Sequence, residues 1–316
     1  MGTIVGFGEC VIDFIPQGEK DSCTLYQACP GGSVANLCVV AAQMGENSIF
    51  IGGVGDDPFG YMLRDTLARY GIDSGGMILM KDYGTSLTFV HIHGEGREYS
   101  FANQPSAEKM VNICQVDLAR IKTADVLYVS SNATVGNASH ATQNELLKFA
   151  KAHGIIISYD VNYRANNYSS PENALDNLRA PLAFADVVKA TEEELMFITG
   201  ANGQEGANKL IESGIKCVLI THGRDGASYY LRNASNRILS KAVKVIDPVG
   251  AGDCFLGAFL ARMLKTNGFS AFDEVLVKNA VAFGNKVAGI SVSRMGAMSG
   301  VPTLAEVEYD SASHAV

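Results

Sequence analysis

Residues 247–253, Asp-Pro-Val-Gly-Ala-Gly-Asp, combine residue types that can bind an anion and accept a proton. Residues 242–246 before them predict a strand, and the apolar residues 254–264 after them predict a buried helix. Small residues between a strand and a helix let backbone amides approach a ligand. The first turn of a helix also has unpaired N–H groups and the positive end of the helix dipole. The segment therefore predicts an anion site, and phosphate is the usual anion at such a site.

The carboxylate of Asp253 needs its own explanation, because it would repel a phosphate. It fits if it accepts the proton of a hydroxyl group that then attacks phosphorus. The structural alternative is that Gly250 and Gly252 form a tight turn and Asp253 is an ordinary acid in the first turn of a helix. The heptapeptide alone leaves both interpretations open.

Polar residues near the N-terminus suit a ligand with several hydroxyl groups. Asp13 is a single acid inside an apolar strand, where an unpaired charge is costly. It either faces water at a sheet edge or accepts hydrogen bonds from a ligand. Gly31 and Gly32 precede a helix predicted over residues 34–44, and Asn36 lies in its first turn. These residues either contact a ligand or form a turn followed by a capped helix.

Two other patterns are incomplete. Gly6-Phe7-Gly8 resembles the start of a dinucleotide-binding fingerprint, but Val11 replaces the third glycine and the next residues predict a strand. His91 and His93 share one strand face, a pattern that some metal hydrolases use. No clear set of further ligands accompanies them, so an exposed polar strand face is the better interpretation.

Composition limits the class of protein. The 316 residues are 47% hydrophobic, with a net charge of −8, and mean hydropathy is +0.10. No apolar run approaches the ~18 residues of a membrane helix, and the acidic charge argues against broad nucleic-acid binding. The seven cysteines are scattered and form no Cys-x-x-Cys pair. We therefore expect a cytoplasmic protein with reduced cysteines, without membrane or nucleic-acid partners.

The order of predicted elements indicates an α/β fold. Strands are predicted at residues 4–7, 49–54, 126–130, 155–160, 187–189 and 217–221, and helices at 61–70, 142–152, 173–179, 192–199, 205–213 and 273–289. This alternation predicts a mostly parallel sheet with helices on both faces, and ligands beyond the carboxyl ends of its strands. Asp160, Thr221 and the Asp247 loop fall at such ends. Residues 85–93 and 98–101, around Gly94-Glu95-Gly96, predict a hairpin that forms a small flap.

These motifs together resemble a known family. Gly31-Gly32-x3-Asn36 with residues 52–60 is similar to the first signature of the ribokinase-like sugar kinases, the PfkB family, and residues 247–253 are similar to the second. The resemblance runs from about residue 4 to residue 302. It implies one ribokinase-like α/β domain over residues 1–316, with a β lid from segments near residues 13–30 and 77–104.

Within the family the chain is most similar to fructokinases. The matching segments are residues 8–16, Pro105-Ser106-Ala107, Asp160-x-Asn162-x-Arg164, residues 192–195 and residues 286–297.

The chain also departs from the fructokinase pattern. Asn103 stands where the lid often has arginine, and no tryptophan follows Arg164. Thr191 stands where asparagine is common, and Pro248-Val249 replaces the frequent Thr-Thr. The first two departures lie near the sugar, so they weigh on the substrate. Kinases for 2-keto-3-deoxygluconate share Asp-x-Asn-x-Arg and the Ser-Ala of the lid, and are the nearest alternative.

The resemblance implies transfer of the γ-phosphate of ATP to a primary hydroxyl of a ketose-type sugar, with Asp253 as the base. The amides of Gly250, Ala251 and Gly252 would stabilise charge on the phosphoryl oxygens. Arg164 would face the phosphates or an anionic sugar, or else form a surface salt bridge. The implied sugar contacts are Asp13, Gly31, Gly32, Asn36, Asn103 and Asn162, and the implied ATP contacts are Thr191, Thr221, Gly223, Gly226, Gly252 and Asn285.

Metal ions and a partner subunit are also implied. Glu194 matches the acidic position associated with Mg²⁺, although Thr191-x-x-Glu194 is equally a capping box. A monovalent-cation site, usually for K⁺, is implied at Asp247, Val249, Ser291, Arg294 and Gly296. Lids of relatives pair between subunits, so we expect a homodimer. Ribose and nucleoside kinases of the family, and a non-catalytic sugar sensor, remain further alternatives.

Overall fold

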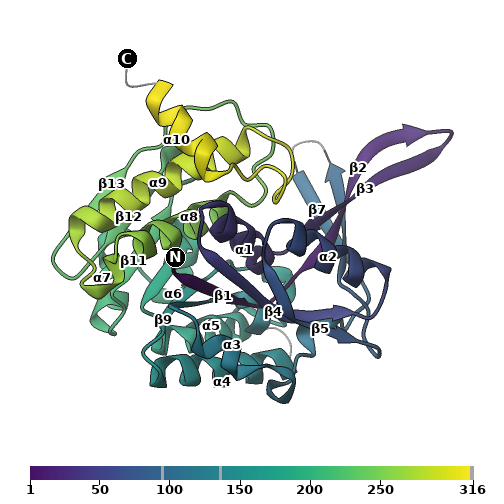
Figure 1. Cartoon of the computed structure of the whole chain (residues 1–316), viewed down its shortest axis with the longest axis horizontal. Coiled ribbons are helices and arrows are strands. Elements are labelled where there is room, and N and C mark those ends of the chain that lie inside the picture. Colours follow the sequence, from purple (N-terminus) through teal and green to yellow (C-terminus); the bar gives the residue numbers. More distant parts are fainter. Residues whose placement is uncertain (94–95, 135–136, 314–316) are drawn as a thin grey trace.

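The computed structural model describes residues 1–93, 96–134 and 137–313. Its larger sheet has nine strands among these residues, in the order β13-β12-β11-β10-β9-β8-β1-β4-β5 (Figure 1). The strands are β1 (Thr3–Phe7), β4 (Asn47–Gly55), β5 (Asp73–Met80), β8 (Val126–Ser130), β9 (Ile156–Asp160), β10 (Val187–Thr191), β11 (Cys217–Thr221), β12 (Ala227–Tyr230) and β13 (Ser235–Ile238). The pairs from β5 to β11 are parallel, and β12 and β13 add an antiparallel edge. The predicted mostly parallel sheet is confirmed.

Helices cover both faces of this sheet. One face carries α1 (Ser33–Gln43), α2 (Pro58–Arg69), α8 (Ala251–Lys265), α9 (Glu274–Val292) and α10 (Leu304–Ser313), and the other carries α3 (Leu118–Lys122), α4 (Asn137–Ala152), α5 (Pro171–Arg179), α6 (Glu192–Thr199) and α7 (Gly203–Glu212). Side chains alternate between the two cores along a strand: Cys217 and Leu219 of β11 pack in the first, Val218 and Ile220 in the second. This double burial explains why these strands are uninterrupted apolar runs.

A smaller sheet projects from the body as the lid. It has the order β3-β2-β6-β7, with β2 (Val11–Lys20), β3 (Cys23–Gly31), β6 (Leu87–His93) and β7 (Gly96–Ala102), and the β2–β3 hairpin extends far beyond α2 (Figure 1). Phe14 stacks on Phe89 at 4.8 Å between ring centroids and meets Phe59 of α2 edge-on at 5.8 Å. This aromatic cluster packs one face of the lid against the body, and Asp13 lies on the opposite face.

Two sequence expectations about strands were wrong. Residues 77–80, expected in the lid, belong to β5 and pair in parallel with β4. Residues 242–246 form no strand, because no neighbouring strand pairs with them, and Val245 and Ile246 are about half exposed. Their β-branched side chains gave a local strand signal that tertiary context did not support. The predicted hairpin is present as β6 and β7, but its Gly94-Glu95 turn lies outside the described residues.

Candidate active site

The strands β9, β10 and β11 end beside the start of α8, and this junction holds the predicted anion loop. Gly250 is the N-cap of α8 with φ 78°, a left-handed conformation that glycine adopts without strain. It supplies no side-chain cap, so the first turn of α8 keeps backbone amides for a ligand. The Ala251 N–H bonds the Pro248 carbonyl at 3.3 Å. Gly252 is therefore better placed than Ala251 to donate to a phosphate.

Asp253 is buried at this junction, with 8% of its surface exposed. Asn36 of α1 donates its Nδ2–H to Asp253 Oδ2 at 2.8 Å, although the residues are 217 positions apart. The Asn36 Oδ1 is buried and bonds to no other described group. Burial raises the pKa of Asp253 to about 7, while the Asn36 amide and the Lys189 charge lower it. The carboxyl can thus exchange a proton near neutral pH, as a general base must.

A buried ion pair, which the sequence analysis missed, lies next to the anion loop. Lys189 Nζ is 3.1 Å from both carboxylate oxygens of Asp160, and the side chains are 7% and 0% exposed. A Cβ built on Gly252 would lie 2.9 Å from Lys189 Nζ, so the ammonium contacts the loop itself. The signal in the sequence was a single charge at the end of the otherwise apolar strand Val-Val-Lys.

The predicted sugar-binding residues near the lid come together. Burial raises the pKa of Asp13 to about 6, against a hydrogen bond from Thr88 that lowers it. Asp13 is therefore not a water-facing edge acid. A Cβ on Gly31 would lie 2.5 Å from Asp13 Oδ2, and one on Gly32 would lie 2.7 Å from the Glu9 carbonyl. Gly32 also has φ 103°. A side chain at either position would clash with these atoms, and the backbone of Gly31 lies near the Asp13 carboxyl.

Glu9 is a second residue that the sequence analysis did not single out. Its Oε1 accepts the backbone N–H of Ser33 at 2.8 Å, the Ser33 hydroxyl at 2.5 Å and the Asn132 amide at 2.8 Å. Its Oε2 accepts the Ser130 hydroxyl at 3.3 Å. The carboxylate joins the start of α1 to the segment after β8, directly before the first lid strand. No local pattern signals this role, because every partner is at least 24 positions away.

Three other predicted residues are not brought to Asp253 by any described contact. Asn103 is exposed with φ 60°, and its Nδ2 donates to the Thr85 carbonyl at 2.8 Å. Asn162 is buried with φ 36°, and its carbonyl accepts the Ser131 hydroxyl. Arg164 is exposed, and its Nη1 lies 3.4 Å from the Tyr163 carbonyl.

Glu194 performs the capping role that its spacing predicted. Thr191 accepts the Glu194 N–H at 3.2 Å, and Glu194 Oε2 accepts the Thr191 N–H at 2.8 Å. Glu194 Oε1 accepts the N–H of Tyr163 at 2.8 Å. Burial raises the pKa of Glu194, against the Lys189 charge. Each oxygen has a second lone pair, so the carboxylate could still accept a metal-bound water.

Three of the predicted nucleotide residues, Thr221, Gly223 and Gly226, lie at the end of β11 and in the loop before β12. Gly223 and Gly226 both have positive φ, at 57° and 90°. The Thr221 hydroxyl lies 3.5 Å from the Ala190 carbonyl. Asn285 of α9 donates to the Ile238 carbonyl at 2.8 Å and so ties α9 to the end of β13.

The predicted cation residues belong to two loops that Asp247 holds together. Asp247 is 6% exposed; its Oδ1 accepts the Val249 N–H at 3.1 Å and its Oδ2 accepts the Gly296 N–H at 3.0 Å. The Ser291 carbonyl accepts the Arg294 N–H at 3.0 Å. Within the described ranges, no three His, Cys, Asp or Glu side chains cluster as a metal site. His91 instead bonds the Ser100 hydroxyl at 2.8 Å.

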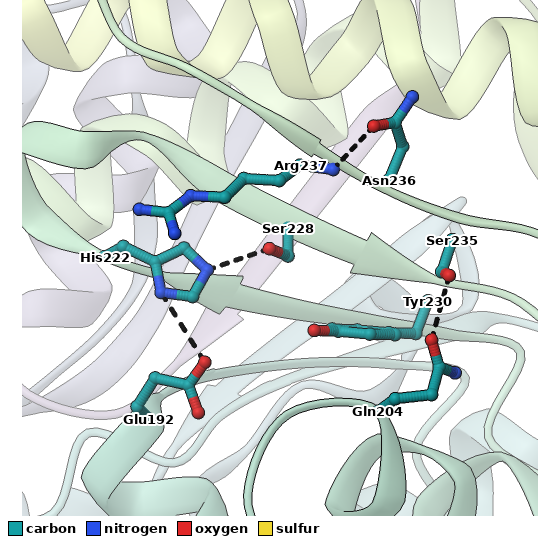
Figure 2. Close-up of a pocket in the computed structure, with 8 residues that line it drawn as sticks. All are labelled: Glu192, Gln204, His222, Ser228, Tyr230, Ser235, Asn236 and Arg237. Carbon is teal, nitrogen blue, oxygen red and sulfur yellow. Dashed lines mark hydrogen bonds and ion pairs between the residues drawn. The ribbon is translucent and has the colours of Figure 1, made fainter.

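A polar hollow of about 320 Å³ is lined by residues of α6, α7, β12 and β13 and by His222 after β11 (Figure 2). Figure 2 shows His222 between Glu192 and Ser228, with the Ser228 hydroxyl 2.8 Å from Nε2. The backbone N–H of His222 also bonds the Gly226 carbonyl at 2.8 Å. These bonds of His222 help to fix the loop between β11 and β12.

A glycine-rich loop at a helix start, a buried acid beside it and a β lid are the features expected of a carbohydrate kinase. The chain belongs to the pfkB family carbohydrate kinases, whose family profile matches residues 1–304. It is an ATP-dependent sugar kinase with the ribokinase-like fold. Among the described residues, none of the helices combines the length and apolarity needed to cross a bilayer.

Relatives and solved structures agree with this assignment. The chain is 32% identical to probable fructokinase-5 of Arabidopsis thaliana over 311 residues, covering 96% of each protein. It matches a fructokinase with bound ATP from Xylella fastidiosa with a TM-score of 0.92 and 28% identity, over 99% of each chain. It matches a fructokinase from Vibrio cholerae O395 with bound fructose, ADP and calcium with a TM-score of 0.88 and 30% identity, over 98% of each. A putative ribokinase II from E. coli with ATP and Mg²⁺ gives a TM-score of 0.88 and 26% identity, over 99% and 100%.

Proposed function

We propose that this sugar kinase phosphorylates fructose on a primary hydroxyl, with Asp253 as the general base. The observation that carries the proposal is the buried Asp253–Asn36 pair at the start of α8. The carboxyl can accept a proton near neutral pH, and the unpaired Asn36 Oδ1 can accept a hydrogen bond from the sugar. The similarity to fructokinases over 96% of the chain supports fructose.

The reaction begins when the sugar hydroxyl is held against Asp253 and gives up its proton to the carboxylate. The hydroxyl oxygen attacks the γ-phosphorus of ATP, the bond to the bridging oxygen breaks, and ADP leaves. The amides of Gly250, Ala251 and Gly252 surround the phosphoryl oxygens, with Gly252 contributing most because the Ala251 N–H already bonds Pro248. Lid closure excludes water and limits wasteful ATP hydrolysis.

Asp13, Gly31, Gly32, Asn36, Asn103 and Asn162 are the sugar contacts of the proposal. Thr191, Thr221, Gly223, Gly226, Gly252 and Asn285 are its ATP contacts. The side-chain NH₂ groups of Asn103 and Asn285 donate to the backbone carbonyls of Thr85 and Ile238.

Mg²⁺ would neutralise charge on the ATP phosphates. Glu194 would hold it through water, because both carboxylate oxygens already accept backbone N–H groups. A K⁺ ion would be held by carbonyl oxygens near Val249, Ser291, Arg294 and Gly296, and Asp247 keeps those two loops together. The donor set of oxygens suits both ions.

The same proposal includes a cytoplasmic homodimer that pairs through the lid. The lid carries exposed apolar side chains, Phe101 at 48% and Leu25 at 44% exposure. A lid of four strands also has open edges that a second subunit can cover.

The second candidate substrate is 2-keto-3-deoxygluconate. It is favoured by the exposed Arg164, whose guanidinium is free of any described carboxylate and could bind a substrate carboxylate.

Turnover with ATP and Mg²⁺ should be measured for fructose, 2-keto-3-deoxygluconate, ribose, tagatose phosphate and adenosine, with and without K⁺. Fructose should give the highest kcat/KM. A preference for 2-keto-3-deoxygluconate that Arg164→Ala abolishes would replace fructose by the acid sugar. Binding of a sugar without any turnover would indicate a sensor.

A further inference from the structure

The Asp160–Lys189 pair places a single ammonium among several buried acids of the crevice. Asp160 is the last residue of β9 and Lys189 is the middle residue of β10. The parallel register of the two strands places Lys189 opposite Asp160 and so brings the side chains together. Both oxygens of Asp160 are equidistant from Nζ, at 3.1 Å. The ammonium also touches Gly252, which is bonded directly to Asp253.

The charges that face Asp253 come from every element around it. Asp160 of β9 and Glu9, which follows β1, oppose its ionisation, and Lys189 of β10 favours it. Tyr128 of β8 also interacts with it, but burial raises the Tyr128 pKa well above its usual value, so that ring is neutral. Asn36 of α1 contributes a neutral donor. Lys189 is thus the only cation among the described groups that act on the carboxyl.

We propose that Lys189 is a positioning residue whose ammonium favours the ionised form of the Asp253 carboxyl in the free enzyme. It acts through Asp253 and through the anion loop that it contacts at Gly252. The Asp160 carboxylate fixes the ammonium in place and holds it protonated. The proposal rests on the proposed role of Asp253 as base.

The energetics support this assignment. Burial alone would lower the pKa of Lys189 and favour its neutral form, yet the carboxylates of Asp160, Glu194 and Asp253 raise that pKa. An ion pair is poor evidence for stability, because a well-packed apolar pair would serve as well. Without Lys189, Asp253 would face two acids and no cation in a site of low dielectric. It would then keep its proton at neutral pH and could not accept another.

The test is the pH dependence of kcat/KM for the sugar in wild type, Lys189→Met, Lys189→Arg and Asp160→Asn. Lys148→Met is the control, because Lys148 is an exposed lysine of α4 paired with Glu145. We expect Lys189→Met to move the acid limb of the pH profile up by at least one pH unit. At a given pH below that limb, this shift is a tenfold loss of ionised Asp253. Activity should recover at alkaline pH. Asp160→Asn should move the limb down, because it removes a repelling charge. Lys189→Arg should keep most of the wild-type profile.

A second readout does not depend on turnover. The ¹³C carboxyl resonance of Asp253, assigned by its loss in Asp253→Asn, should titrate at higher pH in Lys189→Met and lower pH in Asp160→Asn. This titration tests the inference even if the panel contains no substrate. If the midpoint of the acid limb in wild-type kcat/KM differs from the titration midpoint of this resonance, the role of Asp253 as the base is contradicted. Unchanged titration in folded Lys189→Met, with equal loss of activity at every pH, would overturn the inference and leave Lys189 as a direct phosphate ligand.

Discussion

At the residue scale, Asp253 has two features that destabilise its ionised carboxyl and that a purely structural acid would avoid. Its carboxyl is buried, and two further acids act on it, Asp160 and Glu9. A single neutral amide, that of Asn36, donates to it at 2.8 Å. An ordinary helix-start acid would be solvated and would accept backbone amides of its own turn. Such a destabilising position fits the proposed role of Asp253 as a group that exchanges protons during phosphoryl transfer.

Asp253→Asn should abolish that exchange with little change in shape. We expect kcat to fall by about 10²–10⁴-fold, the usual contribution of a general base, with sugar binding retained. Steady-state kinetics and calorimetric sugar titration check this. Turnover within tenfold of wild type would contradict the role of Asp253.

The same variant should be more stable than wild type above neutral pH. The Asp253 pKa rises from 3.8 in the unfolded chain to about 7 when folded, so the folded protein binds a proton that the unfolded chain has released. Stability then falls as pH rises from about 4 to about 7. Each pH unit between the two pKa values is worth about 1.4 kcal/mol as an upper bound.

Thermal unfolding at pH 5 and pH 8 measures this difference. The Tm of Asp253→Asn should exceed that of wild type at pH 8, and the gap should shrink at pH 5. A variant that is less stable than wild type at pH 8 would mean that ionised Asp253 is well compensated.

The sequence predicted candidate site residues where local motifs signal them, as at Asp253, Asn36 and Gly32, and the structure brings Asn36 against Asp253. Lys189 and Glu9 were missed because their partners lie on other elements: Asp160 is 29 positions from Lys189, and Asn132 is 123 from Glu9. Such pairs are set by which strands become neighbours, and a local pattern does not contain that information.

At the scale of elements, Glu9 links three segments that must keep register: the entry to the lid, the start of α1, and the segment after β8. The first turn of α1 carries Asn36, so a shift of that turn moves the amide that holds Asp253. The proposed base is thus supported by a carboxylate whose described hydrogen bonds go to Ser33, Ser130 and Asn132 and not to Asp253.

Glu9→Gln should raise the KM for the sugar about tenfold or more and leave the KM for ATP within twofold. The NH₂ group of the glutamine would face donors whose hydrogen bonds the carboxylate now accepts. Each hydrogen bond to a charged group that is lost costs about 1.5–3 kcal/mol of stabilisation. Glu46→Gln is the matched control, since Glu46 is equally buried but bonds the Gly2 N–H near the other end of α1. Equal effects of both changes on the sugar KM would contradict the proposed link.

The base of the lid depends on Asp57. This N-cap of α2 accepts the Gly60 N–H and also both the N–H and the hydroxyl of Thr85, each at 2.8 Å. Asp57→Ala should lower stability by about 0.5–2 kcal/mol for the cap alone and also raise the sugar KM, because Thr85 leads into β6. Asp65→Ala, on the exposed side of the same helix, should change neither. Chemical denaturation and kinetics would show whether the two effects separate.

Sequence patterns predicted elements well where the local and tertiary signals agree. Residues 34–44 became α1 and residues 217–221 became β11 as expected. The exceptions are segments whose state depends on a neighbour. Residues 242–246 have strand-forming side chains but no strand beside them, and residues 77–80 pair with β4 because that edge of the large sheet is free. The local signal was the same in both, and only the sheet order separates them.

At the scale of the whole molecule, the lid is attached by one face only. The Phe14 cluster binds that face to α2, whereas Asp13, Thr88 and Phe101 share the other face through the ladder. Phe101 is 48% exposed on the same face as Asp13, the proposed sugar contact. An apolar side chain exposed on this face is best covered by the lid of a second subunit, and such a contact would couple dimer formation to sugar binding.

Phe101→Glu should therefore weaken the homodimer and raise the sugar KM together, because a charge in the interface repels its symmetric copy. Sedimentation velocity at micromolar concentration should show a dimer for wild type and a concentration-dependent monomer for the variant. Val275→Glu, at an exposed apolar site of α9, is the control and should stay dimeric. If Phe101→Glu remains a dimer with normal kinetics, the subunits pair elsewhere; if it becomes monomeric with an unchanged sugar KM, the lid closes over the sugar without help from its partner.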